Sequence, residues 1–177
     1  MRIRVTLGIL VLAFASVHAY GADKQTTTDD YDGVYIKRPA IVVSDLERAL
    51  HLWRDVLGMT VDGINKEKPD SLAYDLFDVP KTATLRFATL NAGARQERTY
   101  GMLEISGMDV PRLSGIRRAG VVVNANGRWS EIRAAVQDMG LTLLREKVLV
   151  TKDQGTGIET GFVDWDGNLI VVYQLPG

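Results

Sequence analysis

The sequence contains no cysteine and only two histidines. Without cysteine the chain can form no disulfide framework and carries no thiol for a lipid anchor. One of the histidines, His18, lies in a segment that we expect to be removed, which leaves His51 as the only imidazole. A metal site built from two or more histidines is therefore excluded.

Neither sign of charge predominates, because the sequence contains 21 basic and 22 acidic residues. Proteins that bind nucleic acid usually carry a basic surface, so we expect no nucleic-acid partner. The 177 residues are 46% hydrophobic, as in ordinary soluble proteins, and suggest one domain or two small fused halves.

Long hydrophobic runs are also missing, except for one near the N-terminus. Arg2 and Arg4 precede an apolar stretch at residues 5–15. This stretch is shorter than the roughly 20 residues needed to span a bilayer. Small residues then follow, as signal peptidase requires, and we predict cleavage after Ala19 or, as the second choice, after Ala22.

Residues 1–19 are thus interpreted as a signal peptide, with a buried N-terminal helix as the alternative. The mature protein is expected to be exported, either to a periplasm or into the medium, with no membrane attachment after the signal is removed. Residues 20–33 are polar and poor in aliphatic side chains, so they are expected to form a disordered lead-in.

The remainder of the chain contains an internal repeat. The stretch IVVSDLERALHLWRDVLGMTV can be aligned with VVVNANGRWSEIRAAVQDMGLTL if two extra residues are allowed in the second. In the first copy Ser44 and Glu47 form a candidate capping box, and Gly58 follows the last apolar position of the helix. Strands are predicted at 35–43, 59–64, 83–90 and 101–106, and in the second copy at 119–123, 141–144, 147–151, 159–163 and 168–174.

The first copy therefore reads as strand, helix and three further strands, and the second repeats this order with one additional short strand. We predict an α+β fold of two βαβββ modules, at residues 34–107 and 116–177, around a shared core.

Two stretches carry a resemblance to a known family. RPAIVVSDLERALHLWRDVLGM resembles the opening of a vicinal oxygen chelate (VOC) module, and VDWDGNLIVVYQ resembles the closing strand of that family. The family contains glyoxalase I, extradiol dioxygenases and bleomycin-resistance proteins. The resemblance implies a cupped mixed sheet with helices outside, and it implies a divalent metal held by His, Glu, His and Glu on the first, fourth, fifth and eighth strands.

Three of the four metal-binding positions carry other residues here. The resemblance places Arg38, Arg118 and Val171 at the positions of the two histidines and of the closing glutamate, and only Glu104 matches. A guanidinium has no lone pair for a metal, and valine has no donor atom. We therefore expect no metal and no other cofactor, and we interpret His51 as a residue of the helix surface.

Strand alternation predicts which side chains share the cavity. It assigns Arg38, Arg86 and Glu104 to the inner side, together with Arg118 from the repeat alignment and Tyr173 from the last strand. Two interpretations remain open. Arginines could neutralise Glu104 and close the site as a buried ion pair, or an unpaired arginine could bind an anionic ligand through bidentate hydrogen bonds.

Three functions follow. The leading hypothesis is an exported, metal-independent protein of VOC type that binds a small, anionic molecule in the sheet cavity, as a monomer or homodimer. The alternatives are a lyase or oxidoreductase of the glyoxalase or dioxygenase kind, and a structural or interaction module whose cavity is filled.

Overall fold

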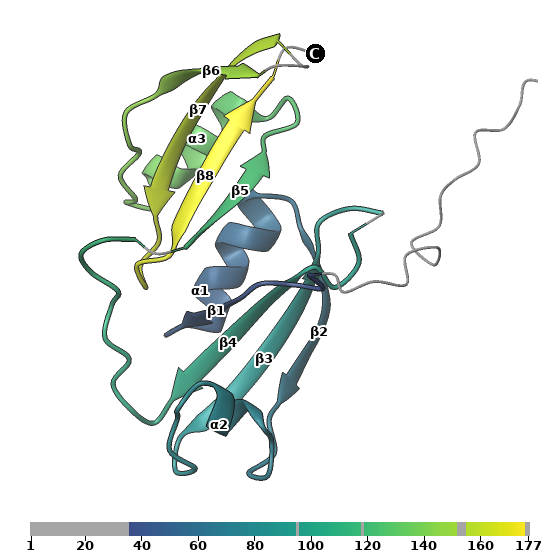
Figure 1. Ribbon diagram of the computed structural model, residues 1–177, viewed down its shortest axis with the longest axis vertical. Helices are drawn as coiled ribbons and strands as arrows, with labels where there is room; N and C mark the ends of the chain where they lie inside the picture. The colour runs from purple at the N-terminus through teal and green to yellow at the C-terminus, as the bar shows by residue number, and fades with distance from the viewer. Residues whose placement is uncertain (1–35, 95, 118, 152–154, 176–177) are drawn as a thin grey trace, which may run out of the picture. The chain divides into compact units, whose positions relative to one another are not determined.

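The computed structural model describes residues 36–175, apart from positions 95, 118 and 152–154 (Figure 1). The predicted signal peptide and lead-in lie outside the described residues. In the described part, no helix is both long and apolar enough to cross a membrane.

The first module runs from β1 to β4 (Figure 1). Its elements are β1 (Ala40–Val43), α1 (Leu46–Leu50), η2 (His51–Val56), β2 (Thr60–Lys66), α2 (Ala73–Leu76), β3 (Thr84–Asn91) and β4 (Tyr100–Ser106). The strands form one sheet in the order β1-β4-β3-β2, in which β1 and β4 are parallel and the other neighbours are antiparallel.

The second module repeats this arrangement. Its elements are β5 (Gly120–Asn124), α3 (Trp129–Asp138), β6 (Lys147–Thr151), β7 (Gly155–Val163) and β8 (Leu169–Gln174). The sheet order is β5-β8-β7-β6, again with one parallel pair. The predicted α+β fold of two βαβββ modules is confirmed, although the strand expected at 141–144 is reduced to an isolated bridge between Leu143 and Phe162.

The first helix begins one residue later than the capping box predicts. Asp45, not Ser44, is the N-cap, and its carboxylate accepts a hydrogen bond from the Arg48 amide at 3.0 Å. The helix continues as the π-helical η2 and ends before Gly58, whose φ of +81° is a conformation that glycine adopts without strain. The predicted end of the helix is therefore confirmed.

Two hydrophobic clusters lie on opposite faces of the first sheet. The larger one joins α1, η2 and α3 to both sheets, and we call the sheet face that contacts these helices the helix face. It includes Trp53, Met102, Val136, Phe162 and Ile170. The smaller cluster lies on the other, inner face of the first module and contains Tyr74, Val79, Ala83, Leu85, Leu103 and Ile105. Both faces of the first sheet are thus buried, the inner one under α2 and its flanking residues.

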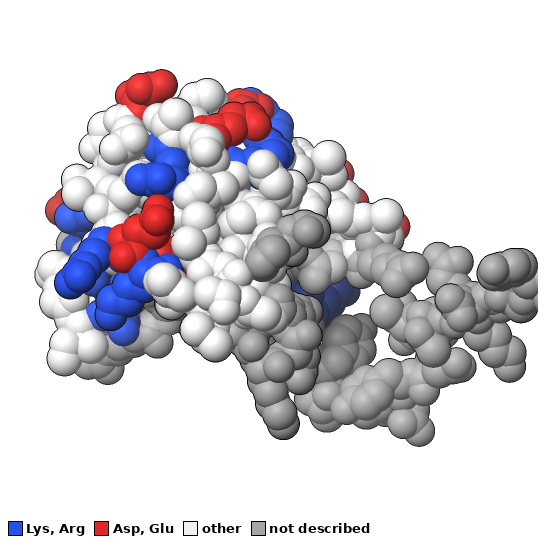
Figure 2. Space-filling view, turned by 90° about the horizontal axis from the view of Figure 1, so that it is seen from above, with Lys and Arg blue, Asp and Glu red and all other residues white. Residues whose placement is uncertain are grey.

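Charges of both signs are interspersed on the molecular face shown in Figure 2. This face therefore has no large area of a single charge sign.

Candidate functional site

Arg86 and Glu104 lie on the helix face of the first sheet, not in the cavity. Strand register pairs Glu104 with Val43 on one side and with Arg86 on the other. Side chains alternate along a strand, so Glu104 shares the face of Met102, which belongs to the core beneath α1. The expectation that Arg86 and Glu104 point into the cavity is wrong.

The cause of this error is the second core. Leu85 and Leu103, which alternate with Arg86 and Glu104, are buried on a face that lies against α2 and not against α1. A sheet buried on both sides offers apolar residues to each face, and so the pattern alone could not decide which face carries the helix.

Glu104 is hydrogen-bonded to the first residue of α1. Its Oε1 accepts hydrogen bonds from the Leu46 amide and from Arg86 Nη2, both at 2.9 Å, while its Oε2 accepts from Arg86 Nε at 2.5 Å. The side chain of Glu104 is 11% exposed and that of Arg86 is 36% exposed. The bidentate pair holds the pKa of Glu104 below its usual value, with the Leu46 amide contributing. The arrangement is a closed ion pair that anchors a helix.

Arg38 lies on the opposite face of the same sheet. Strand alternation places it with Ala40 and Val42, as predicted, and its guanidinium is 5.8 Å from the centre of the Phe87 ring. Its Nη1 also donates to the carbonyl oxygen of Arg98 at 3.4 Å. The sheet therefore separates Arg38 from the pair formed by Arg86 and Glu104.

The remaining predicted site residues lie in or near the second module. Tyr173 and Val171 alternate with Ile170 and Val172, which belong to the helix-face core, so both point to the inner face as predicted. Arg118 lies outside the described residues. The structure thus does not bring the predicted set together, and the role of each residue in ligand binding stays a prediction.

The closing motif DWDGN forms a turn between β7 and β8. Asp164 is 2% exposed, and its carboxylate accepts hydrogen bonds from the amides of Asp166 and Asn168. Burial raises the pKa of Asp164, against the effect of these hydrogen bonds.

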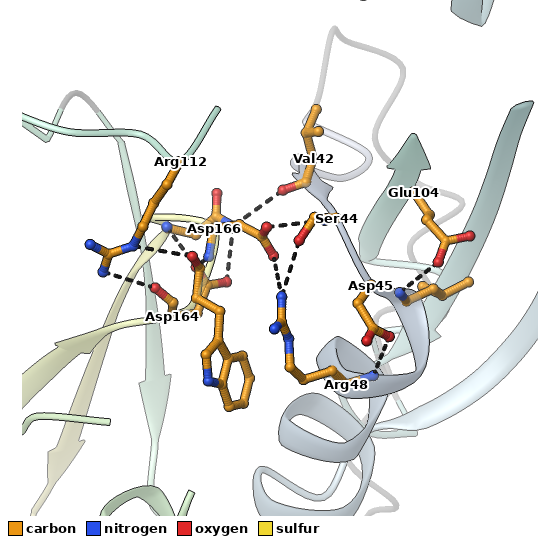
Figure 3. Close-up of polar contacts among 11 residues, drawn as sticks. Val42, Ser44, Asp45, Arg48, Glu104, Arg112, Asp164 and Asp166 are labelled. Carbon is orange, nitrogen blue, oxygen red and sulfur yellow. Dashed lines mark hydrogen bonds and ion pairs between the residues drawn. The ribbon is translucent and has the colours of Figure 1, made fainter. Parts of the chain in front are cut away.

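The same turn contacts the first module (Figure 3). Asp166 Oδ1 accepts from the Ser44 amide at 3.1 Å, and Asn168 Nδ2 donates to the Val42 carbonyl at 3.3 Å. The guanidinium of Arg48 lies 4.9 Å from the centre of the Trp165 ring. The final turn of one module therefore fixes the helix start of the other.

A cavity of about 490 Å³ lies along the edges of β1 and β5. One wall is the segment that connects the modules, residues 112–117, which we call the connecting segment. Arg112 and Arg117 are the only charged side chains among the described lining residues. The other described lining residues are Pro39, Ala40, Ile41, Leu113, Ser114, Gly115, Ile116, Ala119, Gly120, Val121, Val163, Gly167, Asn168 and Leu169.

The connecting segment is held by the DWDGN turn. The Leu113 amide donates to the Asp166 carbonyl at 2.9 Å, and Arg112 donates to the carbonyls of Trp165 and Asp164 at 3.1 and 3.3 Å (Figure 3). A side chain at Gly167 would overlap Leu113, so the close approach requires glycine.

Sequence reasoning missed this cavity. A signal was present, because residues 110–119 contain three arginines and no acidic residue. The cavity depends on where the segment lies between two sheet edges, however, and neither periodicity nor the resemblance predicts that position.

Comparison with solved structures agrees with this architecture. A glyoxalase family protein from Bacillus cereus superposes with a TM-score of 0.61 at 12% identity, over 85% of this chain and 100% of the other. The chain has the vicinal oxygen chelate fold. A glyoxylase/bleomycin resistance protein/dioxygenase domain from Frankia sp. matches with a TM-score of 0.53 at 13% identity, over 82% and 99% of the two chains.

A third structure, from the mobile metagenome of V. pseudocholerae, matches with a TM-score of 0.51 at 17% identity, over 83% of this chain and 98% of the other. No family model and no curated protein matches the sequence. At these identities the likeness establishes the VOC fold alone.

The residues at the family's metal positions do not fit a divalent ion. Arg38 and Val171 have no lone pair to donate, and neither has Val172, which by strand register is the counterpart of Glu104 in the second module. Both carboxylate oxygens of Glu104 are engaged by Arg86 or Leu46 on the helix face. Among the described residues, no group of three or more His, Asp and Glu side chains is placed to hold a metal. His51 is 60% exposed and bonded to Asp55, which confirms its place on the helix surface.

Proposed function

We propose that this protein is exported and binds a small organic anion, without a metal, in the cavity at the edges of β1 and β5. One observation carries the proposal: the only charges among the described lining residues are two arginines. A volume of about 490 Å³ also falls within the range of ordinary small-molecule sites.

Arg117 supplies the free cation. Arg117 has no ion pair or side-chain hydrogen bond within the described part of the chain, whereas Arg112 is bonded to two carbonyls. The planar guanidinium matches a carboxylate through two parallel hydrogen bonds. This gives the positive side of the cavity a group that can select anions.

Binding is favoured over catalysis by the composition of the wall. The described lining residues include no Asp, Glu, His, Lys or Tyr that could act as a general base. Export is supported by the N-terminal sequence, and the balanced charge supports the absence of nucleic-acid and membrane partners. A monomer or a homodimer is compatible with a cavity whose described lining comes from one chain.

The test is a thermal-unfolding screen of the purified chain with acetate, succinate, benzoate and octanoate, before and after chelator treatment. An anion at a hundredfold excess over its Kd should stabilise the fold by about 2.7 kcal/mol. Arg117→Gln should abolish the stabilisation, and Arg145→Gln, at an exposed site outside the cavity lining, should retain it. Absence of any stabilisation, or its loss after chelation, would contradict the proposal.

A second candidate is a structural module with a filled cavity. It is favoured by the first module, whose inner face is already covered by the cluster around Leu85 and Leu103. The same screen separates the two, since a filled module would respond to no anion.

A further inference from the structure

We propose that the ligand of this cavity is an amphipathic monocarboxylate, with its carboxylate on Arg117 and an apolar body along the seam between β1 and β5. This inference rests on the proposed function and narrows it to a chemical class. It follows from three features of the wall: a cation, Arg117, with no bonded partner among the described residues, few free polar groups, and exposed aliphatic side chains.

The polar capacity of the wall is small. Arg112 is held by the carbonyls of Trp165 and Asp164. Asn168 donates its side-chain amide to the Val42 carbonyl and the Asp164 carboxylate. Arg117, the Nη1 group of Arg112 and the hydroxyl of Ser114 are the side-chain donors that remain in the described lining. One carboxylate can use these donors, whereas further polar groups of a ligand would find few partners along the aliphatic remainder of the wall.

The rest of the wall is aliphatic. Ile41, Val121 and Leu169 come from the strands, and Pro39 and Ala40 from the edge of the first sheet. On the connecting segment, Leu113 is 66% exposed and Ile116 is 90% exposed. Covering such side chains with an apolar ligand removes apolar surface from water and makes binding more favourable. The wall therefore favours a hydrocarbon body over a polar one.

The charge of the wall selects the head group. With no acidic lining residue described, nothing in the cavity would repel an anion or attract a cation. A neutral alcohol of the same length would keep the apolar contacts but lose the charge-assisted pair with Arg117. Both ends of the ligand are thus needed for tight binding.

The inference is tested by calorimetric titration of the full chain with hexanoate, octanoate and decanoate. Each buried methylene contributes about 0.8 kcal/mol, so Kd should fall about fourfold per methylene, or roughly fifteenfold per pair. 1-Octanol and inorganic phosphate, which each keep one half of the recognition, should bind at least tenfold more weakly than octanoate.

Three variants test whether the alkanoates bind in this cavity and through Arg117. Arg117→Gln should weaken octanoate at least tenfold and remove its advantage over 1-octanol, while Arg145→Gln should change neither. Ala40→Leu, which narrows the cavity without altering its charge, should weaken decanoate more than hexanoate. The variant proteins are compared by circular dichroism, so that loss of folding is not mistaken for loss of binding.

The outcomes separate this inference from the proposed function. If succinate or benzoate binds through Arg117 but the alkanoate series is flat, the anion site stands and the amphipathic class is overturned. Equal Kd values for octanoate and 1-octanol would likewise overturn it. The same holds if Ala40→Leu leaves the dependence of Kd on chain length unchanged. If none of the anions binds, the proposed function itself fails.

Discussion

The two modules have the same order of strands, but the inner face is buried in the first module and open in the second. In the first module, the connection from β2 to β3 contains α2, and the inner face is closed by a cluster in which Leu85 and Leu103 are fully buried. In the second, β6 and β7 are joined by a short connection between Thr151 and Gly155, and Val122 on the inner face is 62% exposed. The longer connection thus provides the first module with a second core, while the second module keeps an open face.

The helix faces differ as well. The positions of Arg86 and Glu104, which pair across β3 and β4, correspond by register to Thr160 and Val172 across β7 and β8. The first module fixes its helix with an ion pair, whereas Thr160 bonds to the Leu144 carbonyl at 2.8 Å and Val172 packs in the core. Duplication has therefore left two modules with one topology and different sources of stability.

The largest loss of stability is expected at Leu103, compared with its counterpart Val171 on the inner face of the second module. Leu103 and Val171 pair with Val42 and Val122, respectively, but only Leu103 is fully buried. Leu103→Ala should lower the free energy of unfolding by about 2–5 kcal/mol, because it leaves a cavity in the second core. Val171→Ala should cost less than about 1 kcal/mol. Urea unfolding of both variants checks this, and equal losses would show that the second module has a comparable inner core.

A smaller effect is expected from the ion pair on the helix face. Glu104→Gln should lower stability by about 1–2 kcal/mol at neutral pH, since it removes one charge of a pair that is partly screened by solvent. Glu47→Gln is the control, because the Glu47 carboxylate contacts the same arginine but is 68% exposed.

The effect of pH on this pair has a definite sign. The pKa of Glu104 is lowered in the folded state, so its contribution is present above the unfolded pKa near 4.3 and is lost as the pH falls. The difference between the wild type and Glu104→Gln should therefore shrink between about pH 5 and pH 3. Asp164 acts in the opposite direction, because burial raises its pKa and its contribution falls as the pH rises. A difference that grows on acidification would contradict the assigned role of Glu104.

Much of the fold followed from local signals. The repeat and the glycine after the helix predicted the βαβββ order, because the strands and helices of each copy depend on residues close together in the chain. The inner-face positions of Val171 and Tyr173 also followed, since strand alternation on β8 has a single buried core to satisfy.

The site could not be predicted in the same way. Arg86 and Glu104 were assigned to the wrong face because the apolar residues in and after α2, which bury the opposite side of β3 and β4, were not assigned to a second core. The cavity with Arg117 was missed because its walls come from β1, the connecting segment and β5, whose proximity is a tertiary property.

The smallest expected effect concerns the contact between the modules. The start of α1 receives a cap from its own Asp45 and a further hydrogen bond from Asp166 of the second module, whereas α3 has no side-chain cap. Asp166→Ala should cost about 1 kcal/mol, as for the loss of a helix cap, and Asp166→Asn should cost less because an acceptor oxygen is kept. Asp45→Ala serves as the comparison within one module. If hydrogen exchange at the Ser44 amide is unchanged in Asp166→Ala, then the second module does not stabilise the helix of the first. In that case the two modules would be independent at this helix, and the asymmetry of their caps would have no energetic consequence.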